Sequence, residues 1–230
     1  MLKFLIISVL FSKMPGYLMQ EDMNGKVFLF PEESNSSYVK LLPEKSGPYK
    51  ALSVCLRYYS WLYRGFTLFS LATSDINNDF HLFYSPRHYF RVSVGNEDLI
   101  FKGINLETWR SLCASWDSSS GVVEIWIHGN PYPRKIFQKG HIISKDPSII
   151  IGQEQLLHGN YFNITQSFVG EISDIHMWDT ALTFKNISDV LQYNNLTGNV
   201  ISWSSLNYKA EGHIAVLPCL KSMYPISTCN

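Results

Sequence analysis

The sequence predicts an all-β protein in which two sheets pack as a sandwich or jelly roll, with one short helix. Short strand-like runs recur along the chain with turn residues between them, a pattern typical of all-β folds. Only one stretch, near the C-terminus, has helical periodicity. With 230 residues and a hydrophobic content of 46%, the chain can fill one large core. We expect a single domain, because no linker, charge run or internal repeat divides the sequence.

Each predicted strand is a short apolar run that ends at a turn signal. In one of them Leu52, Val54, Leu56 and Tyr58 alternate with smaller or polar residues, as in a strand with one buried face. The predicted strands are residues 26–30, 38–42, 52–58, 66–72, 80–84, 90–94, 99–102, 111–116, 122–128, 149–151, 168–178 and 200–203.

The predicted helix follows Thr183, whose hydroxyl can accept a hydrogen bond from the free amides of a first turn. Ile187, Val190 and Leu191 share one face at helical spacing. We expect this face to pack against a sheet.

Charge and hydropathy exclude two classes of function. The chain has 19 basic and 19 acidic residues, so it has no electrostatic field suited to nucleic acid. No run of about 18 apolar residues occurs, so no transmembrane segment is expected.

The N-terminus has the features of a secretory signal. Lys3 precedes an apolar run at residues 4–11, and Pro15 then breaks it. We predict that residues 1–19 are a signal peptide, that residues 20–230 form the domain, and that the protein is secreted. No clean cleavage pattern precedes Gln20, so an uncleaved anchor is the alternative.

Four cysteines behind a signal peptide favour disulfides in an oxidising compartment. Cys55 and Cys113 both lie in strand-like sequence, which suits a bridge across neighbouring strands, although four thiols allow three pairings. Cys219 and Cys229 could close the tail on itself, or stay free or pair between molecules. Four Asn-x-Ser/Thr sequons support export and predict glycosylation sites at Asn35, Asn163, Asn186 and Asn195.

One segment is rich in side-chain oxygens between two predicted strands. It offers Glu154, Gln155, Asn163 and Gln166, and Ca²⁺ takes six to eight oxygens, usually with several carboxylates among them. Leu156 interrupts the series with a side chain that cannot ligate a metal. The loop therefore suggests a calcium-dependent binder and argues against its calcium at the same time.

Eight sequence strings resemble the pentraxin family when taken together. They are, in order along the chain, GKVFLFPEES, YVKLL, FSLAT, CASWDSSSG, IIIGQEQ, QSFVGEI, MWD and LNY. The resemblance implies a flattened two-sheet jelly roll, a concanavalin-like sandwich, with the helix on one face and calcium loops on the other. It also implies a Cys55–Cys113 disulfide, a homopentameric ring, and calcium-dependent binding of phosphocholine, phosphoethanolamine or related anionic head groups.

Five residues match the family's calcium-binding positions. Asn77 and Asn78 fall in the first loop, and Glu154, Gln155 and Gln166 fall in the second. If they act as in the family, they are the candidate Ca²⁺ ligands of this chain.

The chain departs from the family at several of these positions. The first loop usually reads Asp-Asn-Glu, whereas this chain has an asparagine first and Asp79 last. Leu156 replaces an aspartate and Asn163 replaces a glutamate, so four ligating carboxylates are reduced to Glu154. Because affinity at such loops depends on ligand charge and number, we expect calcium binding to be weakened or lost.

The resemblance also indicates a ligand pocket beside the metal positions. Phe83 matches the apolar residue that packs on choline methyl groups, and Asp98 lies near the acid that faces the quaternary ammonium. An aromatic ring with an acid suits a cation. The alternatives are that Phe83 is an ordinary strand residue and Asp98 a solvated loop acid.

Motifs of hydrolases, zinc proteases and nucleotide-binding proteins do not occur in the sequence. Glu154 with Asp174 could form a glycosidase pair, but nothing in the sequence places them across a cleft. His176 is expected to be structural. We therefore expect no enzyme, and the two hypotheses are a pattern-recognition binding protein, or a structural or degenerate relative that has lost its ligand site.

Overall fold

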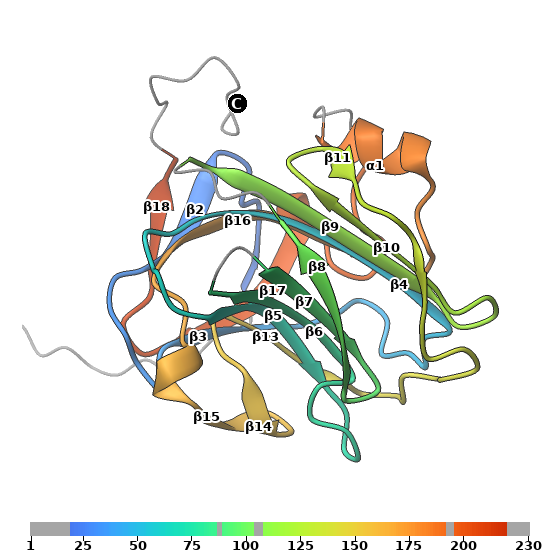
Figure 1. Cartoon of the computed structure of the whole chain (residues 1–230). Helices are drawn as coiled ribbons and strands as arrows, with labels where there is room; N and C mark the ends of the chain where they lie inside the picture. Colours follow the sequence, from blue (N-terminus) through green and yellow to red (C-terminus); the bar gives the residue numbers. More distant parts are fainter. Residues whose placement is uncertain (1–18, 87–88, 104–107, 192–195, 220–230) are drawn as a thin grey trace, which may run out of the picture.

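The computed structural model describes residues 19–86, 89–103, 108–191 and 196–219. Two large antiparallel sheets face each other and enclose the core (Figure 1). Within these described ranges, one α-helix lies outside the sheets. The predicted all-β, two-sheet architecture with a single helix is confirmed.

The first sheet, called the site sheet below, has the strand order β1-β17-β3-β13-β5-β6-β7-β8. Strands far apart in the sequence are neighbours in this order, such as β3 with β13 and β17. The strands are β1 (Met19–Glu21), β3 (Tyr38–Leu41), β5 (Phe66–Ala72), β6 (Phe80–Ser85), β7 (Tyr89–Val94), β8 (Glu97–Lys102), β13 (Ser148–Ile151) and β17 (Leu206–Glu211).

The second sheet, called the helix sheet below, has the order β11-β10-β9-β4-β16-β2-β18, and β12 also pairs with β10. Its strands are β2 (Lys26–Phe30), β4 (Ala51–Tyr59), β9 (Arg110–Asp117), β10 (Val122–Ile127), β11 (Asn130–Pro131), β12 (Lys135–Ile136), β16 (Gly170–Trp178) and β18 (Ala215–Pro218). The remaining elements are the hairpin strands β14 (Gln155–Leu157) and β15 (Asn160–Phe162), the 3-10 helices η1 (Ile164–Gln166) and η2 (Trp203–Ser205), and the helix α1 (Phe184–Leu191).

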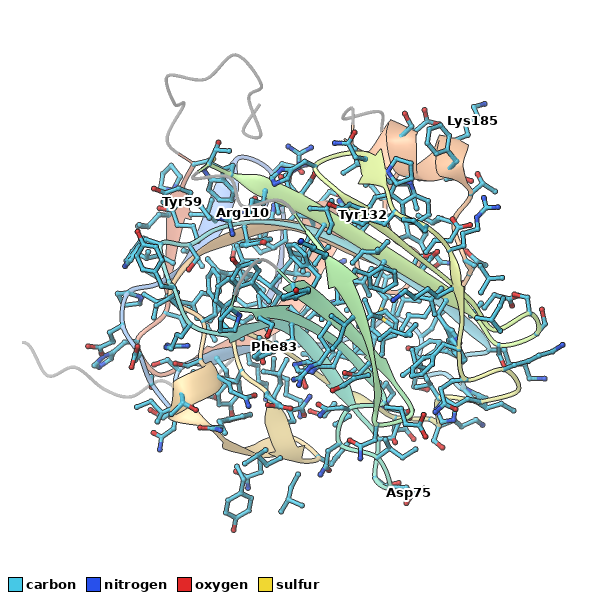
Figure 2. All side chains as sticks on the ribbon, in the orientation of Figure 1. Tyr59, Asp75, Phe83, Arg110, Tyr132 and Lys185 are labelled. Atoms are coloured by element: carbon cyan, nitrogen blue, oxygen red, sulfur yellow. A yellow bond between two sulfur atoms is a disulfide. The ribbon has the colours of Figure 1, made fainter. Side chains whose placement is uncertain are left out.

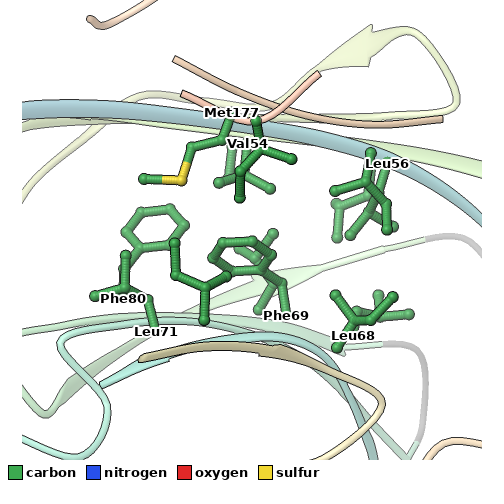
Figure 3. Close-up of a cluster of buried hydrophobic side chains, with 14 of the residues drawn as sticks. Val54, Leu56, Leu68, Phe69, Leu71, Phe80 and Met177 are labelled. Carbon is green, nitrogen blue, oxygen red and sulfur yellow. The ribbon is translucent and has the colours of Figure 1, made fainter. Parts of the chain in front are cut away.

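The core lies between the two sheets. Val54 from β4 and Met177 from β16 face Phe69, Leu71 and Phe80 of the site sheet (Figure 3). All five side chains are fully buried. Burying a side chain of this size stabilises the fold by about 1.5–3 kcal/mol, so this layer of contacts holds the sheets together.

The helix α1 covers the outer face of the helix sheet. Thr183 caps it, because its Oγ1 accepts a hydrogen bond from the Asn186 amide at 3.3 Å. Ile187 is buried and Val190 packs beside it, as the spacing predicted. The cluster under the helix contains Cys55, Cys113, Trp126, Trp178 and Leu182.

The structure confirms the Cys55–Cys113 disulfide, which joins β4 to β9. The two residues are direct partners in the strand register, so their side chains meet on the same face of the sheet. Cys219 is also disulfide-bonded, and its partner lies outside the described residues.

The prediction of a strand at residues 200–203 is wrong. Ile201 makes only an isolated bridge to Met177, and the chain then turns into η2. Val200, Ile201 and Trp203 are buried, so the apolar run reflects burial rather than a hydrogen-bonded ladder. Seven strands of the structure are absent from the predicted set, namely β1, β11, β12, β14, β15, β17 and β18.

Among the described residues, no helix is long and apolar enough to cross a membrane.

Candidate functional site

The candidate site lies on the outer face of the site sheet, where strand alternation places several chemically active side chains. On β6, Leu82 belongs to the core, so Phe83 lies on the opposite face. On β7, Val92 belongs to the core, so Arg91 also lies on the outer face. The strand register places Arg91 directly opposite Phe83 (labelled in Figure 2).

Phe83, Arg91 and Asp98 form one contact group on this face. The guanidinium carbon of Arg91 lies 4.3 Å from the centroid of the Phe83 ring. The Nη1 atom of Arg91 lies 3.4 Å from Oδ2 of Asp98. Ser93, the register partner of Asp98, donates a hydrogen bond to Asp98 Oδ1 at 2.6 Å. The predicted pair Phe83 and Asp98 is therefore close together, with an arginine between its two members.

The two loops that the sequence placed in one pocket do meet. Asn78 lies in the loop from β5 to β6, whose outer end is marked by Asp75 in Figure 2. Its Nδ2 donates to Glu154 Oε1 at 2.9 Å, across 76 residues of sequence. The same Glu154 oxygen lies 3.9 Å from Arg91 Nη2, so the loop contact adjoins the Phe83 group. Asn77 is half-buried in the same loop.

The hairpin of β14 and β15 is fixed to the outer face of the site sheet by Gln155. Its Nε2 donates to the main-chain oxygens of Ser70 and Ser148, both at 3.0 Å, and its Oε1 accepts from the Gly159 amide at 2.8 Å. Gln155 is fully buried. Its side chain therefore anchors the hairpin and is not open to a metal ion.

The hairpin exposes apolar side chains in the segment that was expected to supply calcium-ligating oxygens. Leu156 is 46% exposed and Leu157 is 52% exposed. Tyr161 and Ile164 are exposed on the same segment. This surface contributes no metal ligand.

Two of the predicted ligands have a buried amide oxygen without a hydrogen-bond partner among the described residues. These oxygens are Oδ1 of Asn78 and Oε1 of Gln166. Asn163, by contrast, accepts from the Thr165 amide at 3.1 Å and caps η1. Asn78 and Gln166 therefore keep oxygens that could ligate, whereas Asn163 uses its oxygen within its own turn.

Asp79 does not join the Glu154 group. One of its oxygens contacts His141 Nε2, and the other accepts from Thr73 Oγ1 at 3.0 Å. The carboxylate is buried, which raises its pKa, and the hydrogen bond from His141 partly offsets this. Asp79 thus ties its loop to the loop around His141.

A model described as the Pentaxin family matches residues 26–218 of the chain. This chain belongs to the pentraxin family. The match covers both sheets except for β1, together with the loops and the hairpin described above.

Several pentraxins are similar to this chain over most of its length. C-reactive protein of Xenopus laevis is 48% identical over 88% of this chain and 87% of its own. Serum amyloid P-component of Rattus norvegicus is 39% identical over 92% and 93%. Mucosal pentraxin of Bos taurus is 36% identical over 95% and 99%.

A solved pentraxin structure has the same fold. The native heptameric SAP-like pentraxin from Limulus polyphemus is 27% identical, covers 85% of this chain and 95% of its own, and superposes with a TM-score of 0.75. The flattened jelly roll predicted from the resemblance is therefore confirmed.

The donor set does not fit the calcium that the pentraxin resemblance implies. The described residues contain no group of three or more His, Cys, Asp or Glu side chains that could hold a metal ion. Glu154 brings a single negative charge, and Asn78 and Arg91 already approach its Oε1. A site of one shared carboxylate and two amides lacks the charge that tight Ca²⁺ binding needs.

Arg91 is the residue of this site that the sequence reasoning missed. No motif contains it, because its importance lies in a cross-strand position rather than in a string. The alternation of Phe90, Val92 and Val94 as buried residues could have placed it on the outer face. Its pairing with Phe83 depends on the register of β6 and β7, which the sequence alone does not give.

Of the residues considered for catalysis, Glu154 lies in the candidate site, whereas His176 and Asp174 lie on the helix sheet. His176, on β16 of the helix sheet, accepts hydrogen bonds from the amides of Gly198 and Trp203 through Nδ1. Burial lowers its pKa to about 4, so it is a neutral structural histidine at pH 7. Asp174 is on the same strand and pairs with Arg57 at 3.5 Å.

Three of the four sequons lie within the described residues. Asn35 is exposed in the loop between β2 and β3, and Asn163 and Asn186 are half-buried. Asn195 lies outside the described residues.

Proposed function

We propose that this chain is a secreted, oligomeric pattern-recognition protein rather than an enzyme, and that it binds repetitive surfaces through the outer face of the site sheet. The contact of Asn78 with Glu154 beside Phe83 carries the proposal, because it joins both recognition loops and the aromatic pocket into one surface. Membership of the pentraxin family supports it. The ligands are phosphocholine, phosphoethanolamine or other anionic head groups, as the resemblance implies.

Assembly into an oligomer would increase the avidity of such a surface. The related Limulus pentraxin is described as heptameric, which supports an oligomer here, and we propose the homopentamer that the resemblance implies. Weak sites on one face of a ring gain avidity on a repetitive surface, because each later contact is intramolecular.

Two versions of the recognition differ in their need for calcium. In the version that the resemblance implies, Ca²⁺ bridges the protein to phosphate. In the other, the loops keep their shape without metal and contribute contacts of their own. The single carboxylate of Glu154, already shared with Asn78 and Arg91, favours the second version.

Secretion and assembly are tested together. The full chain is produced in mammalian cells, and protein from the medium is measured by native mass spectrometry before and after removal of N-glycans. We expect a glycosylated oligomer of uniform size. A monomer would contradict the ring, and glycosylated protein retained in the cell would favour a degenerate family copy.

Surface binding is tested with vesicles of phosphatidylcholine, phosphatidylethanolamine or phosphatidylglycerol, in the presence of either calcium or EDTA. We expect binding that persists in EDTA and falls steeply as the density of the head group is lowered. Binding abolished by EDTA would support the calcium-dependent version. A secreted oligomer that binds none of these surfaces in either buffer would overturn the proposal.

A second function is favoured by the exposed hairpin. Leu156, Leu157, Tyr161 and Ile164 form an apolar surface in the place of calcium ligands. Such an exposed apolar surface suits a structural or interaction protein that contacts other protein chains and has lost its ligand site. This alternative predicts that the wild type binds none of the vesicles but self-associates. The double variant Leu156→Ser with Leu157→Ser should then lose the self-association.

A further inference from the structure

Arg91 covers the aromatic face of the pocket with a cation from the chain itself. Its guanidinium carbon lies 4.3 Å from the centroid of the Phe83 ring, well within the reach of about 6 Å for a cation–π contact. The Arg91 side chain is only 25% exposed, and Phe83 is 7% exposed. The ring therefore offers almost no free surface to a ligand.

The rest of the Phe83 ring is packed against the protein. A Cβ atom added at Gly65 would lie 2.6 Å from Cζ of Phe83, so the chain at Gly65 passes directly beside the ring edge. The ring of His81 lies 5.8 Å from that of Phe83. Gly65, His81 and Arg91 all adjoin the ring, so a ligand that packs on it must displace the guanidinium of Arg91.

Two carboxylates hold Arg91 in this position. Its Nη1 lies 3.4 Å from Asp98 Oδ2, and its Nη2 lies 3.9 Å from Glu154 Oε1. Asp98 is fixed in turn by Ser93. Without Arg91, two negative charges would stand beside an open aromatic face, which is the chemistry that holds a quaternary ammonium.

We infer that Arg91 is a specificity-determining residue that acts as an internal ligand: it occupies the cation pocket formed by Phe83, Asp98 and Glu154 and competes there with quaternary ammonium groups, so that these bind more weakly than they would to an open pocket. The inference rests on the proposed function, since it concerns the same face. A choline group must displace the guanidinium from the ring and from both carboxylates, whereas a head group without a cationic end need not. Selectivity here comes from a free-energy cost that falls on one ligand class and not on the others.

The test is Arg91→Ser, titrated with tetramethylammonium chloride by calorimetry, with sodium chloride at equal ionic strength as the reference. We expect the variant to bind the probe at least about tenfold more tightly than the wild type, a difference of about 1.4 kcal/mol. Adding Phe83→Ala to the variant should abolish the gain. Vesicles of phosphatidylcholine should then be bound better by Arg91→Ser than by the wild type.

Lys135→Ser is the matched control. Lys135 also stacks on an aromatic ring of the site sheet, at 4.6 Å from the centroid of Phe101, and donates to the Ile100 oxygen. Its loss should produce no gain in binding of the probe.

The inference is overturned if Arg91→Ser keeps the wild-type melting temperature and oligomer mass and binds the probe no better. It is also overturned if the wild type already binds as tightly as the variant. Arg91→Gln, which keeps a planar amide but no charge, gives the same comparison if the serine variant does not fold. Since the probe is monovalent, its result is independent of whether the oligomer binds surfaces.

Discussion

His81 gives the molecule a pH dependence that originates next to the candidate site. It is fully buried on β6, and its Nε2 contacts Thr67 Oγ1 at 3.1 Å. Burial, reinforced by the positive charge of Arg91, lowers the pKa of His81 to about 3. In the folded protein the His81 imidazole is therefore neutral, whereas in the unfolded chain it binds a proton below about pH 6.5.

The sign of the effect follows from this depressed pKa. The contribution of His81 to stability is complete above pH 6.5 and is lost as the pH falls toward 3. Relative to His81→Gln, the free energy of unfolding of the wild type should fall by up to about 1.4 kcal/mol per pH unit in this window. Urea unfolding at several pH values measures the difference. The exposed His213 provides the control variant His213→Gln, and an equal slope in both variants would contradict the assignment.

Single residues of the site divide into those the sequence could predict and those it could not. Phe83, Asp98 and Glu154 were predicted through the resemblance, and the structure brings them to one face. Gln155 was predicted as a ligand, but its amide is used to anchor the hairpin. Arg91 was not predicted, because its role depends on a cross-strand neighbour and not on its place in a motif.

At the scale of elements, the hairpin of β14 and β15 and the loop around Asn78 together decide the response to calcium. We predict that Asn77→Asp combined with Leu156→Asp raises the melting temperature in millimolar calcium but not in EDTA. The two substitutions add two carboxylates beside Glu154, and ligand charge sets the affinity of such sites. Binding of an ion to the folded state alone raises stability in proportion to the logarithm of its concentration over Kd.

Differential scanning fluorimetry with and without calcium measures this shift. Leu157→Asp with Asn77→Asp is the matched control, because it adds the same charge at the neighbouring exposed position. An equal calcium shift in the control, or a shift of the same size in the wild type, would contradict the prediction.

The start of β16 depends on a glycine that packs against β4. Gly170 has a φ of +135°, and a Cβ there would lie 2.1 Å from the main-chain oxygen of Tyr59. Gly170→Ala should therefore reduce the free energy of unfolding by at least about 2 kcal/mol, from backbone strain and overpacking. Gly140 has a φ of +86° with no atom within 4 Å of an added Cβ, so Gly140→Ala reports the strain alone. Chemical denaturation measures the free energy of unfolding of both variants. Equal losses would contradict the prediction, because they would mean that the clash with the Tyr59 oxygen is relieved by a small shift of the chain.

The strands were predictable where an apolar run also forms a ladder. The run at residues 66–72 is buried throughout and forms β5 as expected. The run at residues 200–203 is equally buried, but the amides of Val200 and Ile201 both donate to the Met177 oxygen and that of Trp203 donates to the His176 side chain. The pairing strand β17 follows it and was missed, since its outer half is polar and exposed. Burial is visible in sequence, whereas the choice of hydrogen-bond partner is made by tertiary contacts.

At the scale of the whole molecule, the Cys55–Cys113 disulfide encloses the strands that bear the site. The bridge joins β4 to β9 over a sequence separation of 58 residues. The strands β5, β6, β7 and β8 all lie within the loop that it closes, and they carry Phe83, Arg91 and Asp98. A cross-link on the helix sheet thus restricts the conformations that the strands of the site sheet can adopt in the unfolded chain.

We predict that Cys55→Ala with Cys113→Ala lowers the free energy of unfolding by about 2–4 kcal/mol, because the unfolded chain regains the freedom of this loop. Guanidinium unfolding of the double variant and the wild type measures the loss. The variant should keep the fold at neutral pH, since the core between the sheets contains neither cysteine. Cys55 and Cys113 also pack under α1, so Ile187→Ala in both backgrounds separates lost packing from lost cross-linking. The prediction is contradicted if the double cysteine variant loses less than about 0.5 kcal/mol of unfolding free energy and the effects of the cysteine changes and of Ile187→Ala are strictly additive. The cross-link would then not restrict the unfolded chain.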